Sequence, residues 1–311
     1  MAGRPLRVAT VNLQHGSPSR GDDPRPDSHP RPDSHPRPES HPRPDSHSHP
    51  GLPATHRALV AAGRALAGLE LDVVALQEVD RGQRRSRYVD QARVLARLLR
   101  MPWWRLAAAE VGPRGGPRFR PPFAPTAWRP AYGVALLSRL PVRAWHAWGF
   151  PADLRVLRSA HPLAVGGPVL RLGPFAVRRD EARVALAAEI DAPGGPLAVA
   201  ATHLSTDGDA ARAQLRAVAG RLRTLPGPHV LAGDLNLGPD DVAAVTGLSP
   251  LGVGSTFPAH APRRQIDHVL GALGPPGAAG ATTTGETHRL PVSDHLALVA
   301  TVVGPRRGGA S

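Results

Sequence analysis

The chain has 311 residues, 41% of them hydrophobic and only 4% aromatic, which is enough for one large domain or two small ones. It contains no cysteine, which excludes disulfides, thiolate-bound zinc and a cysteine nucleophile, so any metal must be held by oxygen and imidazole ligands, the kind that suit Mg²⁺, Mn²⁺ or Ca²⁺. The formal net charge of +13 comes from arginine and suits a phosphate-bearing partner, although an arginine-rich surface need bind nothing.

The segment Met1–Thr10 has no apolar stretch of signal-peptide length and passes almost directly into an expected strand at residues 7–12. Nowhere does the chain have about 18 consecutive apolar residues without charge, the length that a membrane-spanning helix needs. We therefore expect no transmembrane segment, and we expect a monomeric protein of the cytoplasm.

Residues 17–50 differ in composition from the rest of the chain. They contain four copies of the unit Pro-Arg-Pro-Asp/Glu-Ser-His, which has no apolar side chain to bury. Prolines at this density rule out a helix or a strand ladder, so the repeat predicts an extended, disordered insert. Its charges nearly cancel, so the basic surplus belongs to the rest of the chain. Its histidines are candidate metal ligands, but a tolerated loop expansion is the favoured explanation.

The remaining elements follow from apolar periodicity. In chain order the pattern predicts a helix at 54–69, a strand at 71–77, a helix at 88–100, strands at 133–138, 184–190 and 197–203, a helix at 210–225, a strand at 229–233, a short helix at 242–246, and strands at 266–270 and 296–303. Proline and glycine predict loops at 105–130 and 271–289, a hairpin turn at 192–196 and a frayed tail at 305–311. Because strands outnumber helices and a hairpin joins two of them, an α+β sandwich is favoured over a parallel sheet.

Polar side chains recur at the ends of the expected strands. A single aspartate or asparagine at such a place is more often a cap or turn residue than a catalytic one. Strand ends in a sandwich converge on one rim, however, and several carboxylates there would repel one another unless a cation or an imidazolium neutralised them. The set therefore indicates metal binding and proton transfer. Its members are Asn12, Glu78, His203, Asp234, Asn236, Asp267, Asp294 and His295.

The segments that carry these residues resemble motifs of the endonuclease/exonuclease/phosphatase superfamily, which includes DNase I-like nucleases, neutral sphingomyelinases and inositol-phosphate phosphatases. The resemblance implies a four-layered α/β/β/α sandwich over residues 1–304, interrupted by the insert, and hydrolysis of a phosphodiester with Mg²⁺, or with Mn²⁺ or Ca²⁺. The matching segments occur in the family's order and are residues 11–16, 76–80, 132–139, 202–204, 233–236, 265–268 and 293–295.

The resemblance also implies which residues hold the metal. Glu78 would be the main carboxylate ligand, and Asn12 and Asp294 would be further ligands or would orient them. The metal would polarise a phosphoryl oxygen and stabilise the leaving oxygen. His295 would pair with Asp267, whose carboxylate would fix the ring tautomer and raise its basicity.

The other implied roles concern the water and the phosphate. Asp234 would position or deprotonate the attacking water, and Asn236 would hydrogen-bond the phosphate as charge develops. His203 would donate to a non-bridging oxygen or protonate the leaving group; the division of acid and base roles between Asp234 and the two histidines stays open. Arg183 is a candidate phosphate contact, as are the arginines between residues 81 and 87, with a solvated arginine as the equal alternative.

Two positions distinguish the chain from abasic-site nucleases, which usually have tyrosine in place of His203 and an acidic residue in place of Gln14. The pattern leans toward the DNase I-like and sphingomyelinase-like branches, and His15 resembles a lipid- or inositol-directed subset. The expected partner is therefore a nucleic acid or a phospholipid- or inositol-type phosphodiester. One alternative is a catalytically silent binding protein on the same fold, and another is a protein that binds metal through the histidines of the insert.

Overall fold

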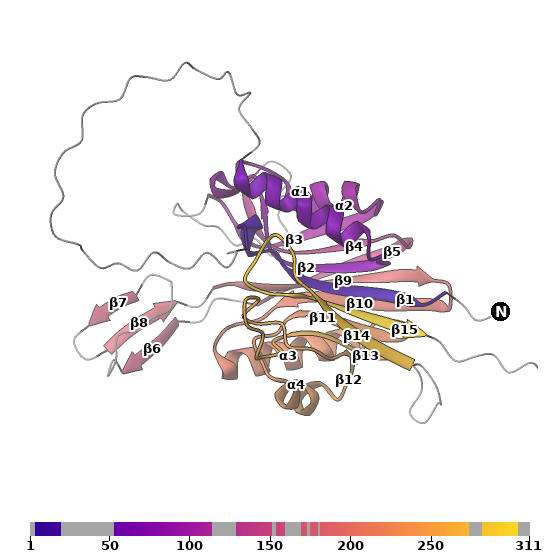
Figure 1. Cartoon of the computed structure of the whole chain (residues 1–311). Helices are drawn as coiled ribbons and strands as arrows, with labels where there is room; N and C mark the ends of the chain where they lie inside the picture. Colours follow the sequence, from indigo (N-terminus) through magenta and orange to yellow (C-terminus); the bar gives the residue numbers. More distant parts are fainter. Residues whose placement is uncertain are drawn as a thin grey trace, which may run out of the picture.

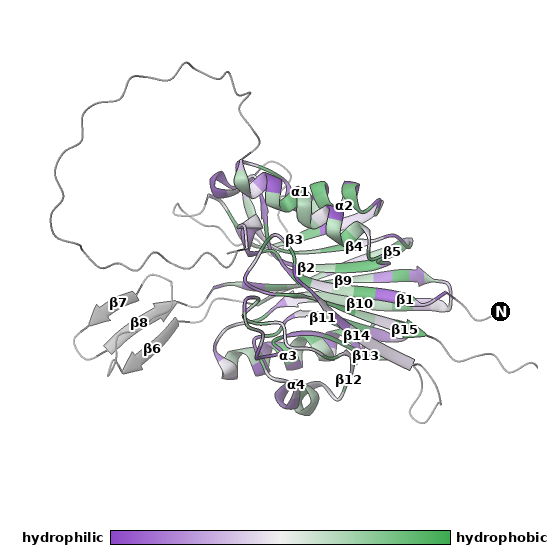
Figure 2. Ribbon diagram, in the orientation of Figure 1, coloured by the Kyte–Doolittle hydropathy of each residue, from purple (hydrophilic) through white to green (hydrophobic). Residues whose placement is uncertain are grey.

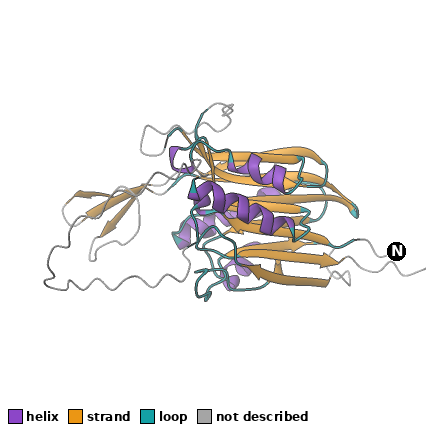
Figure 3. Ribbon diagram, turned by 45° about the horizontal axis from the view of Figure 1, so that its top comes forward, coloured by secondary structure: helices purple, strands orange, loops and turns teal. Residues whose placement is uncertain are grey.

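The computed structural model describes residues 4–19, 53–113, 129–150, 181–273 and 282–303, together with the backbone of three strands between residues 154 and 179. Two six-stranded sheets lie face to face, and two helices cover the outer side of each (Figure 1). The order of layers is helix, sheet, sheet, helix, which confirms the predicted α/β/β/α sandwich; the view in Figure 3 shows helices lying over the strands. No helix in the described ranges combines the length and apolar character needed to cross a bilayer.

The first sheet has the strand order β14-β15-β1-β2-β4-β3 and is mixed. Only β1 and β2 are parallel in it; the other neighbours are antiparallel. Helices α1 (Ala54–Ala67) and α2 (Gln91–Leu98) cover it. Its strands, in spatial order, are β14 (Thr282–His288), β15 (Ala297–Val303), β1 (Leu6–Asn12), β2 (Val73–Arg81), β4 (Ala131–Ser138) and β3 (Trp103–Val111).

The second sheet has the order β12-β13-β11-β10-β9-β5, with β10 and β11 as its parallel pair. Helices α3 (Gly208–Leu222) and α4 (Pro239–Thr246) cover it. Its strands, in spatial order, are β12 (Ser249–Gly252), β13 (Asp267–Ala272), β11 (His229–Asp234), β10 (Gly195–His203), β9 (Arg183–Ala192) and β5 (Val142–Phe150). A separate antiparallel sheet consists of β6 (Leu154–Arg158), β8 (Phe175–Arg179) and β7 (Val169–Leu172).

The core consists of three apolar layers because the central strands are buried on both faces. On β4, Leu136 points between the two sheets, whereas its neighbour Leu137 points toward α1 and α2. On β11, Leu231 packs under α3 with Leu215. This explains the near-continuous apolar runs of these strands, which are largely white to green in Figure 2, whereas the helices carry both green and purple residues.

The parallel strand pairs position the rim at which the polar residues meet. Asn12 at the end of β1 is level with Gln77 of β2, and His203 at the end of β10 is level with Asp234 at the end of β11. Asp267, the first residue of the antiparallel β13, lies opposite Asp234. Both sheets therefore direct the polar ends of their strands to the same edge of the sandwich.

Two predicted loops are partly wrong. Residues 105–111 of the expected loop 105–130 belong to β3, and residues 282–288 of the expected loop 271–289 form β14. Both are edge strands, and β14 reads Thr-Thr-Thr-Gly-Glu-Thr-His with no buried apolar face, so periodicity gave no signal. Strands β5 and β12, also at sheet edges, were not predicted either. Residues 114–128 and 274–281 of these loops lie outside the described residues, as does the expected tail at 305–311.

Most of the expected insert also lies outside the described residues, which leave out 20–52. Its first residues belong to the sandwich. Pro18 forms an antiparallel bridge with Val292, and the amide of Ser293 donates to the carbonyl of Ser17 over 3.0 Å. The chain segment that enters the insert is therefore fixed against the loop that carries Asp294 and His295.

Candidate active site

Asp234 lies at the centre of the rim cluster. It is 2% exposed, and its Oδ2 accepts a hydrogen bond from Asn12 Nδ2 at 3.0 Å. The same oxygen lies 3.5 Å from Nε2 of His203 and 3.8 Å from Nε2 of His295. Its other oxygen, Oδ1, accepts from the backbone amide of Asn236 at 3.1 Å. One buried carboxylate thus contacts side chains from both sheets and from the loop before β15.

The buried position also changes the basicity of Asp234. Burial, and next the charge of Asp267, raise the pKa of this carboxyl well above its ordinary value. The hydrogen bonds from Asn12 and Asn236 and the charge of His295 act in the opposite direction. A carboxylate with a raised pKa is a stronger base than a solvent-exposed one, which suits proton transfer near neutral pH.

His295 and Asp267 form the predicted pair. Nδ1 of His295 lies 2.9 Å from Oδ2 of Asp267, and both side chains are buried. Burial alone would lower the pKa of His295, but the hydrogen bond to Asp267 and the charges of Asp267, Asp234 and Asp294 together raise it to about 9. Phe257 packs against the ring, with centroids 4.8 Å apart. His295 is therefore a fixed imidazolium whose Nε2 faces Asp234.

Thr256 connects the two strands that carry this pair. Its Oγ1 accepts from the backbone amide of Asp267 at 3.3 Å, and its carbonyl accepts from the amide of Leu296 at 2.8 Å. The turn before β15 is further shaped by Ser293, which has a φ of +75° and accepts from the amide of His295 at 3.1 Å. Sequence patterns had no signal for Thr256, because a buried threonine beside a strand is common.

Glu78 lies on the other side of Asn12 and is more accessible, with 20% of its side chain exposed. Oε1 is 3.4 Å from Asn12 Nδ2, and Oε2 is 3.1 Å from Nε2 of His15. Burial raises the pKa of Glu78, as do the charges of Glu181 and Asp294, against the hydrogen bond from Asn12 and the charge of His295. Negative charge thus accumulates around Glu78, as expected where a cation binds.

The remaining predicted residues join the same rim with different degrees of exposure. Asp294 has 49% of its side chain exposed and lies 3.9 Å from Nε2 of His295. Asn236 is left-handed with a φ of +53°, and its Nδ2 donates to the carbonyl of Leu204 at 3.0 Å. The side-chain NH₂ group of Asn236 is therefore bound to the loop after β10. This hydrogen bond stabilises the turn that follows Asp234.

His203 and Arg183 line a small recess between the two sheets together with Tyr132. Burial, then the charges of Arg183 and His295, lower the pKa of His203 well below its ordinary value, so the ring is neutral. Arg183 is 6% exposed, its Nη2 lies 3.7 Å from Glu181, and its Nε has no hydrogen-bond partner. The solvated-arginine alternative for Arg183 is therefore wrong. Of the arginines between 81 and 87, Arg85 instead binds the buried Asp80 through two contacts of 2.7 Å.

The donor set at this rim fits a divalent cation. Asp234, Asp267 and His295 offer ligand atoms that all lie within 4.8 Å of one another, and Oδ1 of Asp267 is buried without a hydrogen-bond partner. Hard oxygen ligands of this kind suit Mg²⁺, Mn²⁺ or Ca²⁺. The three predicted metal ligands, Asn12, Glu78 and Asp294, lie beside this group rather than within it. The rim therefore has two adjoining groups of candidate ligands, and His295 can belong to the first only as a neutral ring, because an imidazolium has no free lone pair.

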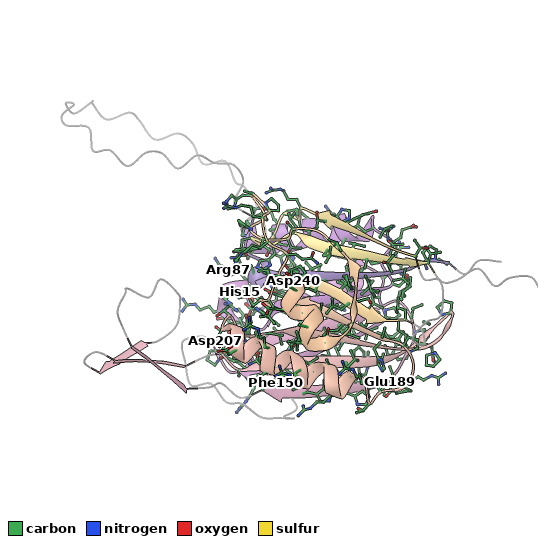
Figure 4. The ribbon with its side chains drawn as sticks, turned by 90° about the horizontal axis from the view of Figure 1, so that it is seen from below. His15, Arg87, Phe150, Glu189, Asp207 and Asp240 are labelled. Atoms are coloured by element: carbon green, nitrogen blue, oxygen red, sulfur yellow. The ribbon has the colours of Figure 1, made fainter. Side chains whose placement is uncertain are left out.

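One contact of the site was not assigned a role from sequence, namely the one between His15 and Glu78. His15 belongs to the short helix η1 (Gln14–Gly16), which follows β1 directly. Burial, and next the charge of Arg85, lower its pKa to about 3, so this ring is neutral as well. Figure 4 shows His15 toward the same end of the molecule as Asp207, the cap of α3, and Glu189 toward the other end.

Comparisons with known proteins agree with this arrangement. A model of the endonuclease/exonuclease/phosphatase family matches residues 9–295. No curated protein matches the chain. Among solved structures, an endonuclease/exonuclease/phosphatase from Beutenbergia cavernae is 23% identical, with a TM-score of 0.56 over 97% of this chain and 72% of that one.

Two other similar structures have more specific names. Sphingomyelinase C from Streptomyces griseocarneus is 17% identical, with a TM-score of 0.55 over 96% of this chain and 100% of that one. A mannosyl-6-phosphatase from Bacteroides thetaiotaomicron is 14% identical, with a TM-score of 0.53 over 96% and 99%. At such identities these structures show a shared fold and do not select a substrate.

Proposed function

Because the chain belongs to the endonuclease/exonuclease/phosphatase family, we propose that it hydrolyses a phosphodiester with a divalent cation and a water molecule activated by Asp234, without a covalent intermediate. The observation that carries this proposal is the position of Asp234, whose Oδ2 lies 3.5 Å from Nε2 of His203 and 3.8 Å from Nε2 of His295. Mg²⁺ is the expected cation, with Mn²⁺ or Ca²⁺ as alternatives. We also keep the predictions of a monomer and of a cytoplasmic location.

Each side chain at the rim has a role that follows from its protonation state. Asp234, held by Asn12 and Asn236, orients the water and takes a proton from it. His203 is neutral and donates to a non-bridging oxygen. His295 is cationic and its Nδ1 donates to Asp267, so its Nε2 is the better donor of a proton to the leaving oxygen. A bound cation would polarise the phosphoryl group and balance the carboxylates.

The substrate is tested with a panel of phosphodiesters, with and without Mg²⁺. Plasmid DNA, RNA, sphingomyelin and a bis-aryl phosphodiester separate nuclease activity from lipid and generic phosphodiesterase activity. The proposal predicts turnover of at least one of them in Mg²⁺ and none in excess EDTA. Turnover that persists in EDTA would overturn the metal-dependent mechanism, whereas metal binding without turnover of any phosphodiester would favour the catalytically silent alternative.

Replacing Glu78 by glutamine distinguishes the two adjoining cation positions. Glu78→Gln keeps the shape of the side chain but removes the negative charge that Glu78 places near Glu181 and Asp294. We expect the Mn²⁺ concentration for half-maximal activity to rise at least about tenfold, because the cation loses a negatively charged carboxylate ligand. Asp267→Asn should change this concentration much less. The opposite ranking would place the cation at Asp234, Asp267 and His295.

Arg183 is proposed as a phosphate contact. Its buried guanidinium has an unpartnered Nε and lines the recess beside His203. A hydrogen bond to a charged group is worth about 1.5–3 kcal/mol, so Arg183→Met should lower kcat/KM by roughly 10- to 100-fold, mainly through KM. Arg216→Met on the exposed face of α3 is the control and should leave both constants unchanged. A wild-type KM in a folded Arg183→Met protein would remove Arg183 from the substrate site.

A further inference from the structure

Glu78 has an unusual backbone conformation for a strand residue. Its φ is +53°, and it lies in a bulge of β2, where the register against β4 shifts between Leu76 and Val79. A bulge redirects side chains that would otherwise alternate between the two faces of a sheet. A left-handed conformation at a residue other than glycine persists only where neighbouring groups hold it. The direction of the Glu78 carboxylate therefore depends on its surroundings.

The residues facing Glu78 across the rim are left-handed as well. Gln14, His15 and Gly16 have φ values of +42°, +60° and +75°. This short left-handed run turns the imidazole of His15 back toward β2, so that its Nε2 lies 3.1 Å from Oε2 of Glu78. The edge of the ring packs against Tyr132, with centroids 5.5 Å apart. Nδ1 of His15 is buried without a partner, and Nε2 is the nitrogen that can donate to the carboxylate oxygen 3.1 Å away.

One buried amide joins both left-handed segments. Gln91, the first residue of α2, is 1% exposed. Its Nε2 donates to the carbonyl of His15 at 2.6 Å, and its Oε1 accepts from the amide of Asp80 at 2.8 Å. Glycine suits position 16 because its φ is +75°, and a Cβ there would also lie 2.8 Å from Nε2 of Gln91. The side chain of Gln91 thus connects the segment of His15 to strand β2. Its contact in β2 is Asp80, two residues after Glu78.

We propose that His15 and Gln91 are positioning residues that hold the Glu78 carboxylate for a divalent cation. His15 acts by donating to Oε2, which leaves the remaining lone pairs of the carboxylate toward the rim. Gln91 acts through the backbone of His15 and Asp80. The inference rests on the proposed function, because it takes Glu78 as a metal ligand. Groups that hydrogen-bond a metal ligand commonly change metal affinity by about 10- to 100-fold when they are replaced.

Direct binding of Mn²⁺ to the full-length protein, measured by calorimetry without substrate, tests the inference. His15→Phe keeps a ring beside Tyr132 but removes the donor, and we expect the Kd for Mn²⁺ to rise about 10- to 100-fold. His15→Gln restores a donor at a similar reach and should recover most of that loss. Gln91→Met removes both amide contacts at similar length and should weaken binding in the same direction. Thermal unfolding in EDTA shows whether each variant is folded.

His146 provides a matched control. Its Nε2 lies 2.8 Å from Oε1 of Glu189, a half-buried histidine–carboxylate pair like that of His15, and Glu189 lies toward the opposite end of the molecule from His15 (Figure 4). His146→Phe should therefore leave Mn²⁺ binding unchanged.

The outcomes separate this inference from the proposed function. If the wild-type protein binds no Mn²⁺, the metal-dependent function fails and the positioning roles fail with it. If the wild-type protein binds Mn²⁺ and folded His15→Phe binds it equally well, only the positioning role of His15 is overturned. An equal loss in His15→Gln and His15→Phe would show that ring shape, and not the hydrogen bond, is what matters. If His15→Phe does not fold, wild-type affinity in Gln91→Met overturns the inference.

Discussion

Replacing Asp234 by asparagine should lower kcat by roughly 10³- to 10⁴-fold, because a positioned general base contributes up to about that much to a hydrolysis. The substitution keeps the shape of the side chain and an acceptor for Asn12, but it removes the charge that faces His203 and His295. KM should change little, since the proposed role of Asp234 concerns the water and not the substrate. Single-turnover kinetics on the substrate found in the panel measure the effect directly.

The stability of this variant provides a second test. Asp234 and Asp267 are buried carboxylates, and the charge of Asp267 disfavours the ionised form of Asp234. Neutral asparagine removes that repulsion, so the free energy of unfolding in EDTA should stay the same or increase. Asp240→Asn, on the exposed first turn of α4, is the matched control and should leave turnover unchanged. Wild-type kcat in Asp234→Asn would remove Asp234 from the mechanism.

Much of the sandwich was predictable because its central strands are apolar on both faces. The runs around Leu76, Leu136 and Leu231 are short and uninterrupted, and each forms a central strand of a sheet. Edge strands lack this signal. In β14 the side chains are polar and largely exposed, and its place in the sheet depends on pairing with the next strand, β15. Pairing with another strand is not encoded in the periodicity of one segment.

For the site, the residues at the strand ends were predictable from the sequence, but the contacts that hold them were not. Strand ends bring Asn12, His203 and Asp234 together because both parallel pairs end at one rim, and this much follows from topology. The roles of His15 and Gln91 did not follow. They depend on left-handed backbone at residues that are not glycine and on one amide that spans two segments far apart in the sequence. Sequence motifs mark such residues without showing what they contact.

The charge states of the two histidines follow from their neighbours and not from their sequence motifs. His203 is buried near Arg183, and burial and the charge of Arg183 lower the pKa of the ring, which is therefore neutral. His295 has Asp267 behind it and Asp234 and Asp294 in front, and the ring is cationic. A substrate phosphate placed between them would meet one neutral donor and one cation, next to a carboxylate with a raised pKa. This asymmetry is the physical basis for assigning acid and base roles that the motifs left open.

Removing the carboxylate behind His295 should have the second largest effect on catalysis. Asp267→Asn keeps the volume of a fully buried side chain but replaces the acceptor that holds Nδ1 of His295 at 2.9 Å. The amide can rotate its NH₂ group toward the ring, which would favour the other tautomer and lower the pKa of His295. We expect kcat to fall roughly 10²- to 10⁴-fold, the range over which acid–base groups contribute.

A double-mutant cycle decides whether the two residues act as a unit. If Asp267 acts through His295, then His295→Ala and Asp267→Asn should each cost nearly as much in kcat as the double variant, because units of catalytic residues are strongly non-additive. Independent roles would instead multiply the two losses. Additive losses, or full activity in His295→Ala, would contradict the proposed pair and would leave proton donation to His203, whose neutral ring and 3.5 Å separation from Asp234 make it the next candidate.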